Sequence, residues 1–100
     1  MSAVHLSSLD NVVVLVREVR PGETIEVAGL PLTVQKPLGV GHKLALLRIA
    51  AGAKIFKHGA AIGSATCDIE PGEHVHLHNM KSDYLPTYTL DEGRLFRGAR

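Results

Sequence analysis

The sequence contains little of what several protein classes need. Its 100 residues include one cysteine, no tryptophan and only four aromatic residues, and the formal net charge is +1. The single cysteine, Cys67, excludes an intramolecular disulfide and any metal site with two thiolates from one chain. Lys and Arg are scattered, apart from Arg94, Arg97 and Arg100 near the end. The weak charge therefore argues against a nucleic-acid partner.

Long apolar runs are also missing. No stretch approaches the roughly 20 apolar residues of a membrane-spanning helix, and residues 1–10 contain no cationic region followed by an apolar one. We therefore expect no membrane span and no secretory signal. The lone cysteine fits a soluble protein of the reducing cytoplasm. With so few aromatic residues, a single small domain must have a core of Val, Leu, Ile and Ala.

A short turn motif recurs along the chain. Residues 19–25, Val-Arg-Pro-Gly-Glu-Thr-Ile, resemble residues 69–75, Ile-Glu-Pro-Gly-Glu-His-Val, and residues 49–55 form a weaker copy. In each copy Gly can adopt the positive φ of a type II turn, and β-branched residues lie on both sides. Each copy is therefore predicted to be a turn between strands, and the Pro-Gly-Glu of the first two copies, at 21–23 and 71–73, is structural rather than functional.

Between these turns the pattern is mostly typical of strands. The segments expected to form strands are Val12 to Val16, Thr24 to Val27, Leu32 to Val34, Ile55 to Lys57 and His74 to Leu77. Lys43 to Ala51 suits either a helical turn or a buried strand, and we favour a strand. The predicted architecture is mainly β, a compact clip-like or barrel-like domain over residues 9–82. Residues 1–8 are expected to form an N-terminal arm, and 83–100 a C-terminal linker or tail.

The most informative segment is residues 73–79, Glu-His-Val-His-Leu-His-Asn, which holds three of the six histidines. In an extended strand, alternate side chains share a face, so His74, His76 and His78 would project together. Three imidazoles on one face indicate a candidate metal or acid–base site. The same alternation is also typical of the solvated face of an edge strand, and for His74 this alternative has equal weight.

Residues 54–79, together with Gly-His-Lys at 41–43, resemble a known family. Gly-His-Lys, Ile-Gly-x-Ala-Thr-x-Asp-Ile and His-x-His-Asn occur in the order found in the SAF domain of altronate and galactarate dehydratases. The resemblance covers about residues 9–82 and implies a β-clip fold. The family often has Tyr at the position of His58 and Pro at that of Ala61, so the loop that carries them is expected to differ.

The resemblance implies a hydro-lyase that removes water from a sugar acid and uses a divalent metal, Fe²⁺ or Mn²⁺. Such elimination needs a base beside the carboxylate and an acid or metal at the leaving hydroxyl, roles that imidazole can fill. His42, His76 and His78 are the candidate catalytic residues, and His76 and His78 are the candidate metal ligands. Lys57 and Asn79 are the candidate substrate-binding residues.

Dehydratases of this kind continue into a much larger domain, and relatives such as sulfolactate sulfo-lyase divide the two parts between subunits. The chain is therefore expected to act with a larger catalytic subunit, which supplies further ligands or a proton acceptor. The alternative is a non-catalytic module that binds a sugar acid or another anion, or mediates assembly. Homo-oligomerisation would cover the open strand edges of so small a β domain.

Overall fold

The computed structural model describes residues 1–83. The predicted linker or tail at 83–100 therefore lies outside the described residues, except for residue 83. The strands are β1 (Ala3–Val4), β2 (Val12–Leu15), β3 (Thr24–Val27), β4 (Leu30–Thr33), β5 (Lys43–Ala45), β6 (Lys54–Lys57), β7 (Ala60–Ala65), β8 (His74–Val75) and β9 (Met80–Lys81). Turns connect them, and the prediction of a mainly β fold is confirmed. Over residues 1–83 there is no helix long and apolar enough to cross a membrane.

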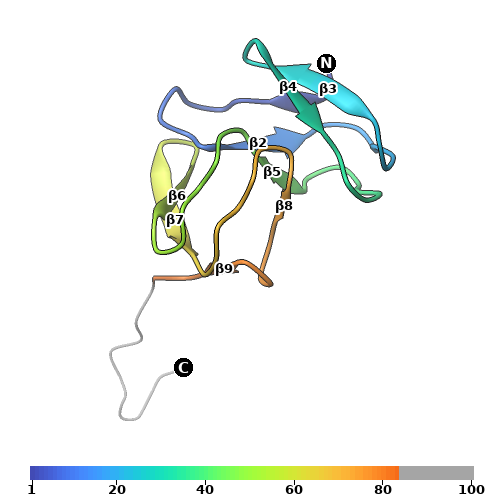
Figure 1. The fold of residues 1–100 in the computed structure, drawn as a ribbon. Helices are drawn as coiled ribbons and strands as arrows, with labels where there is room; N and C mark the ends of the chain where they lie inside the picture. The colour runs from blue at the N-terminus through green and yellow to red at the C-terminus, as the bar shows by residue number, and fades with distance from the viewer. Residues whose placement is uncertain (84–100) are drawn as a thin grey trace.

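A central antiparallel sheet with the order β1-β2-β5-β8 lies between two hairpins. Successive residues of β2 point to opposite faces, so Val13 belongs to one hydrophobic cluster and Val12 to the other. Leu44 and Ala45 of β5 divide in the same way. Figure 1 shows the β3–β4 hairpin above this sheet and the β6–β7 hairpin below it, where β7 also pairs with β9.

The core is aliphatic throughout the described residues, as predicted, but it is divided between the two faces of the central sheet. The cluster beneath the β3–β4 hairpin consists of Ala3, Val13, Leu15, Val19, Ile25, Val27, Leu32, Val34, Leu38, Leu44 and Leu46. The cluster beside the β6–β7 hairpin consists of Val12, Ala45, Ile49, Ile55, Ala65, Ile69 and Val75. Each hairpin therefore closes its own small core against a shared sheet.

Four turns with one sequence pattern organise the chain. Turn one (19–25), turn two (38–44), turn three (49–55) and turn four (69–75) each have a buried apolar residue, a glycine three positions later and a buried apolar residue three positions after that. The four glycines have φ of +83° at Gly22, +92° at Gly41, +85° at Gly52 and +88° at Gly72. The sequence predicts turns one, three and four; turn two was missed.

Each of these glycines also joins its turn to a strand or, for Gly22, to the residue that follows β4. The N–H groups of Gly22, Gly41, Gly52 and Gly72 donate to the carbonyl oxygens of Val34, Leu15, Ala65 and Ala45, each at 2.8 Å. The first residues of the turns pair across the fold, because Val19 bridges to Leu38 and Ile49 bridges to Ile69. Residues 19–45 and 49–75 are therefore two similar halves of the fold, each with one hairpin between two turns.

The hairpin tips of the two halves have the same backbone but different support. Ala28 (φ +52°) and His58 (φ +56°) each precede a glycine that also has positive φ, as in the type I′ turns of tight hairpins. At the second tip, the buried carboxylate of Asp10 accepts hydrogen bonds from the N–H groups of His58 and Gly59, at 2.7 and 2.8 Å. No side chain within residues 1–83 supports the first tip in this way.

Most predicted strands are present, with boundaries shifted by one or two residues. The strand favoured in Lys43 to Ala51 is β5, but it ends at Ala45. β7 was not predicted, because its small residues lack the β-branched pattern; pairing with both β6 and β9 extends it instead. Part of the predicted arm at residues 1–8 forms β1, which pairs with β2 through Ala3 and Val4.

Candidate functional site

The histidine-rich segment is a strand followed by a turn. The predicted strand from His74 to Leu77 ends at Val75, and residues 76–79 turn before β9. Val75 is fully buried whereas Leu77 is 76% exposed, so the strand alternation predicted across both residues is wrong beyond Val75. The turn nevertheless keeps the three imidazoles near one another.

Asn79 holds the turn in shape. Its Oδ1 accepts a hydrogen bond from the backbone N–H of His76 at 3.0 Å, and its Nδ2 donates to the backbone carbonyl of His74 at 2.8 Å. The residue is 4% exposed. A buried amide with backbone partners at both ends fixes the local chain direction. In the structure Asn79 therefore supports the backbone that carries the histidines, and its predicted contact with substrate stays a prediction.

Four histidines gather at this end of the central sheet, and we call His42, His74, His76 and His78 the histidine cluster. The β5–β8 pairing, with Leu44 opposite His74, brings turn two beside turn four. His42 Nδ1 and His74 Nε2 are 3.0 Å apart and share a hydrogen bond. Ring centroids are separated by 4.9 Å for His42 and His74, 6.2 Å for His42 and His76, 5.3 Å for His74 and His76, and 5.6 Å for His74 and His78.

His74 is the centre of this cluster, a position that sequence analysis did not assign to it. Burial, followed by the positive charge of Lys36 and the neighbouring imidazoles, lowers the pKa of His74 from 6.5 to about 4. The ring is therefore neutral at pH 7. Its Nδ1 is buried and has no hydrogen-bond partner within residues 1–83. A buried ring nitrogen without a hydrogen-bond partner costs folding free energy, so stability alone does not explain the position of His74.

The His42–His74 pair has two tautomeric arrangements with different chemistry. When His42 Nδ1 carries the hydrogen and donates it to His74 Nε2, the other nitrogen of His42, Nε2, has a free lone pair. When His74 Nε2 donates instead, His42 Nε2 carries a hydrogen. One pair can therefore present either a proton acceptor or a proton donor at the same atom, which is the property that acid–base chemistry uses.

The cluster does not by itself make a metal centre. Across residues 1–83 no three His, Cys, Asp or Glu side chains are placed to hold a metal ion. His74 and His76 are stacked, with 9° between their ring planes, so their faces rather than their nitrogens oppose each other. His76 and His78 are exposed. A metal held by these two residues stays a prediction and needs further ligands from outside this part of the chain.

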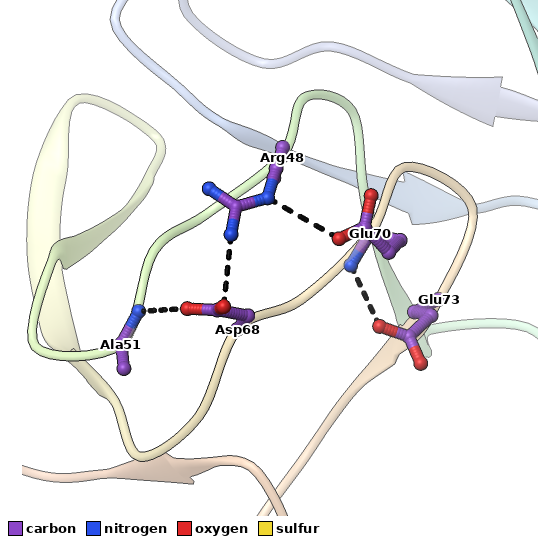
Figure 2. Close-up of polar contacts among 5 residues, drawn as sticks. All are labelled: Arg48, Ala51, Asp68, Glu70 and Glu73. Carbon is purple, nitrogen blue, oxygen red and sulfur yellow. Dashed lines mark hydrogen bonds and ion pairs between the residues drawn. The ribbon is translucent and has the colours of Figure 1, made fainter.

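Charged side chains brace the turn that carries His74 (Figure 2). Arg48 donates to Asp68 at 2.8 Å and to Glu70 at 3.2 Å, and Asp68 accepts from the backbone N–H of Ala51 at 2.9 Å. Glu73 accepts from the backbone N–H of Glu70 at 2.6 Å and so closes turn four. Turns three and four are thus tied together, although each exposed ion pair adds little energy by itself.

Lys57 lies at the end of β6, and no ring contact joins it to the histidine cluster. It is half-buried, as is Lys43 of turn two. Burial, followed by the charge of Lys57, lowers the pKa of Lys43, which places the two ammonium groups within electrostatic reach of each other. Neither lysine has a hydrogen-bond or ion-pair partner in residues 1–83. Binding of substrate by Lys57 stays a prediction.

A cavity of about 380 Å³ opens beside the cluster. Turn four forms one wall, the segment before turn two forms the other, and His74 and His78 lie at its lining. Lys36, which faces this cavity, is a second residue that sequence analysis missed. It stands in a loop without a motif, and only the folded arrangement brings it to His74.

Residues 1–83 match the family model described as the altronate/galactarate dehydratase SAF domain. The chain belongs to this family. The chain is 33% identical to altronate dehydratase of Bacillus subtilis (strain 168) over 111 residues, which cover 99% of the chain and 22% of that protein. It is 37% identical over 83 residues to altronate dehydratase of Escherichia coli (strain K12), covering 83% of the chain and 17% of that protein.

A third relative has a different organisation. The chain is 41% identical to (2R)-sulfolactate sulfo-lyase subunit alpha of Paracoccus pantotrophus over 51 residues, which cover 51% of the chain and 76% of that subunit. The SAF domain thus occurs within large dehydratases and as a subunit of a lyase. The chain spans about a fifth of the length of the two dehydratases that it matches.

Proposed function

We propose that the chain is the SAF part of a sugar-acid hydro-lyase of the altronate/galactarate type and acts together with a larger catalytic partner. The observation that carries this proposal is the pair of imidazoles from turns two and four, 3.0 Å apart, in a chain that belongs to this dehydratase family. Proton transfer at His42 is the contribution of this domain. The larger partner is either more of the same polypeptide, as in the dehydratase relatives, or a separate subunit.

The reaction would use the pair as follows. A base takes the proton from the carbon next to the carboxylate, and the hydroxyl on the neighbouring carbon leaves as water after receiving a proton. With Nδ1 bonded to His74, His42 presents Nε2 as acceptor or donor in a fixed orientation. His76 and His78, both in ring contact with His74, either supply the second proton-transfer group or hold the metal ion.

The larger partner enters the proposal for two reasons. The relatives carry this domain as a small share of a dehydratase or as a lyase subunit. His76 and His78 are exposed, so a second protein surface is needed to exclude water from them. Fe²⁺ or Mn²⁺ is part of the proposal, with His76 and His78 as two of its ligands and the others on the partner. Such an ion would stabilise the negative charge that develops next to the carboxylate.

Lys57 is proposed as a point charge for the acid and Asn79 as a substrate contact, in addition to its support of the turn. The two lysines 43 and 57 favour this for Lys57, because half-buried like charges without a counter-ion are stabilised by a bound anion. A cytoplasmic location and self-association of the domain stay predictions.

The test measures substrate turnover by the lyase assembly that co-purifies with this chain. D-altronate, D-galactarate and sulfolactate are each supplied, with Fe²⁺ or Mn²⁺ and after chelation. His42→Gln is expected to lower kcat by about 10²- to 10⁴-fold, while the matched control His58→Asn, at an exposed histidine outside the cluster, retains activity. Normal turnover by His42→Gln would contradict the proposal. Metal-independent binding of a sugar acid without turnover by any assembly would favour the non-catalytic module.

A further inference from the structure

Exposed apolar side chains lie on the two turns that carry the histidine cluster. Leu77, between His76 and His78 in the chain, is 76% exposed, and Val40, two residues before His42, is 66% exposed. The ring centroids of His42 and His76 are 6.2 Å apart, so the two turns lie side by side. Exposed apolar side chains that gather in one place mark a surface that another protein covers.

A third exposed apolar side chain extends this surface. Leu15 of β2 is bonded to turn two through both of its backbone groups. Its N–H donates to the carbonyl of His42 at 2.9 Å, and its carbonyl accepts from the N–H of Gly41 at 2.8 Å. Val16 therefore leaves β2 beside turn two, and it is 41% exposed. We call the following residues the imidazole face: Val16, Val40, Leu77 and the exposed His76 and His78.

Two lysines near the imidazole face have no counter-ion. Lys36 is exposed and its charge reaches His74, and Lys43 is half-buried in turn two. Neither lysine has a hydrogen-bond or ion-pair partner within residues 1–83. The carboxylates of Glu70 and Glu73 already accept hydrogen bonds from other groups of the domain. The two free ammonium groups therefore fit a protein surface that presents carboxylates to them.

The opposite ends of the central strands lack this combination. Leu9, 68% exposed, precedes β2, and Leu47, 51% exposed, follows β5, so both lie at the strand ends away from His42. The charged neighbours of these two leucines, Asp10 and Arg48, are bonded within the domain. Exposed apolar side chains at that end have neither imidazoles nor unpaired charges beside them, and they provide matched controls.

We propose that the imidazole face is the surface on which the larger catalytic partner docks. Leu77 and Val40 are its apolar contacts, and Lys36 and Lys43 meet carboxylates of the partner. The inference rests on the proposed function, because it names the surface that joins this domain to the partner. Docking there would also cover the exposed His76 and remove it from bulk water.

The charges favour a different protein over a second copy of the chain. In a symmetric dimer the same surface is used by both copies, so pairing through the imidazole face would bring the lysines and histidines of one copy toward those of the other. The matched region is only 22% and 17% of the two dehydratase relatives. Most of each of those proteins is thus available to form a complementary surface of apolar and acidic residues.

The first test measures amide hydrogen exchange by mass spectrometry in the intact lyase assembly that co-purifies with this chain, and in the chain alone. Exchange over residues 38–44 and 74–79 is expected to be at least about tenfold slower in the assembly. Residues 6–11 and 46–51, at the opposite strand ends, should exchange equally fast in both samples. Protection of the opposite strand ends instead, or of neither region, overturns the inference.

The second test changes the apolar contacts. Leu77→Asp is expected to weaken association with the larger subunit about 100-fold in isothermal titration calorimetry, and Val40→Asp about 30-fold, because each places a charge in an apolar contact. Leu9→Asp is the matched control and should bind as the unchanged chain does, as should the conservative Leu77→Met. If the partner is part of the same polypeptide, Leu77→Asp should restore fast exchange over residues 38–44 in the intact protein. Urea unfolding of each variant separates lost docking from lost folding.

The third test concerns the lysines. Raising NaCl from about 0.1 M to about 0.5 M should weaken association of the unchanged chain about tenfold, because salt screens charges at the rim of an interface. The double variant Lys36→Gln/Lys43→Gln should bind more weakly at low salt and lose most of this salt dependence. A salt dependence equal to that of the unchanged chain would show that the lysines do not face the partner.

Unchanged association in both Leu77→Asp and Val40→Asp overturns the inference, as does a dimer of the chain that Leu77→Asp dissociates. The proposed function is separable from these outcomes. Turnover that needs His42, in an assembly that Leu77→Asp leaves intact, retains the function and removes this surface. Association that depends on Leu77, with turnover that His42→Gln leaves unchanged, retains the surface and removes the function.

Discussion

Turns two and four have the same backbone but use the position after glycine for different purposes. In turn four that residue is Glu73, whose carboxylate closes its own turn by accepting the N–H of Glu70. Glu23 does the same in turn one. In turn two the residue is His42, which contacts His74 instead. The same structural position thus closes the turn in turns one and four and contacts a second imidazole in turn two.

The two glycines offer the largest contrast between these turns. A Cβ on Gly72 would lie 2.5 Å from the carbonyl oxygen of Thr33, whereas a Cβ on Gly41 would meet nothing within 4 Å. Both have strongly positive φ. Gly72→Ala is therefore expected to lower the free energy of unfolding by more than about 3 kcal/mol, and Gly41→Ala by about 1 to 2 kcal/mol, from backbone strain alone. Urea unfolding of both variants measures the difference; equal losses would contradict it.

The two hairpin tips give the next contrast, because only the second is held by Asp10. Asp10→Asn removes a charged acceptor from two backbone N–H groups and is expected to cost about 2 kcal/mol of unfolding free energy. Hydrogen exchange should rise at His58 and Gly59 and remain unchanged at Ala28 and Gly29. Uniform loss of protection at both tips would show that Asp10 acts on the whole fold instead.

The same carboxylate predicts a pH dependence. Burial alone would raise the pKa of Asp10, but the backbone N–H groups of Gly59 and His58 and the charge of His5 outweigh it and hold the pKa below its usual value. A lowered pKa stabilises the fold above the unfolded-state value of about 3.9, and this contribution is lost as pH falls through the lower, folded-state pKa. In Asp10→Asn this acid-dependent part of the unfolding curve should be absent.

Exchanging the residue after glycine tests the comparison directly. His42→Glu gives turn two the residue that closes turns one and four, so we expect unfolding free energy to rise by about 0.5 to 1 kcal/mol. Activity of the lyase assembly should fall as far as in His42→Gln, because the imidazole is lost in both. Glu73→Ala is the reciprocal change and should destabilise by a similar amount. A His42→Glu variant that is less stable than His42→Gln would show that the two turns are not equivalent.

The smallest effect is expected at the unsupported tip. Ala28 has φ +52°, a conformation that Asn adopts more readily than Ala. Ala28→Asn should therefore stabilise by about 0.5 kcal/mol in thermal or urea unfolding. His58→Asn at the second tip is the matched change. If Ala28→Asn destabilises, the tip is constrained by something other than its backbone.

The parts of the fold that sequence predicts are those with local causes. Turns one, three and four follow from an apolar residue before Pro-Gly or Ala-Gly, and the paired segments around them follow from their β-branched residues. Turn two has Gly-Val-Gly instead and becomes visible as a turn only beside the other three. β7 contains Ala, Gly and Ser, and it is a strand because β6 and β9 lie on either side of it. Non-local pairing of this kind has no local signal.

The candidate site shows the same difference between residues with a local sequence signal and residues placed by the fold. His42, His76 and His78 can be selected from motifs, and the structure brings His42 and His76 to ring contact. The central role of His74 depends on the register that places it opposite Leu44, and that of Lys36 depends on the fold of a loop 38 residues away along the chain. Strand alternation is wrong beyond Val75, and it is Asn79 and the turn that it closes that keep the three histidines together.

The hydrogen bonds from four turn glycines to backbone carbonyls elsewhere in the fold provide four probes of local opening. Glycine amide signals are readily distinguished in an ¹⁵N–¹H spectrum, and those of Gly22, Gly41, Gly52 and Gly72 each sample a different corner of the fold. Their exchange rates with deuterated solvent would show whether the corners open singly or together. A partner that covers only the imidazole side should slow exchange at Gly41 and Gly72 and leave the other two unchanged.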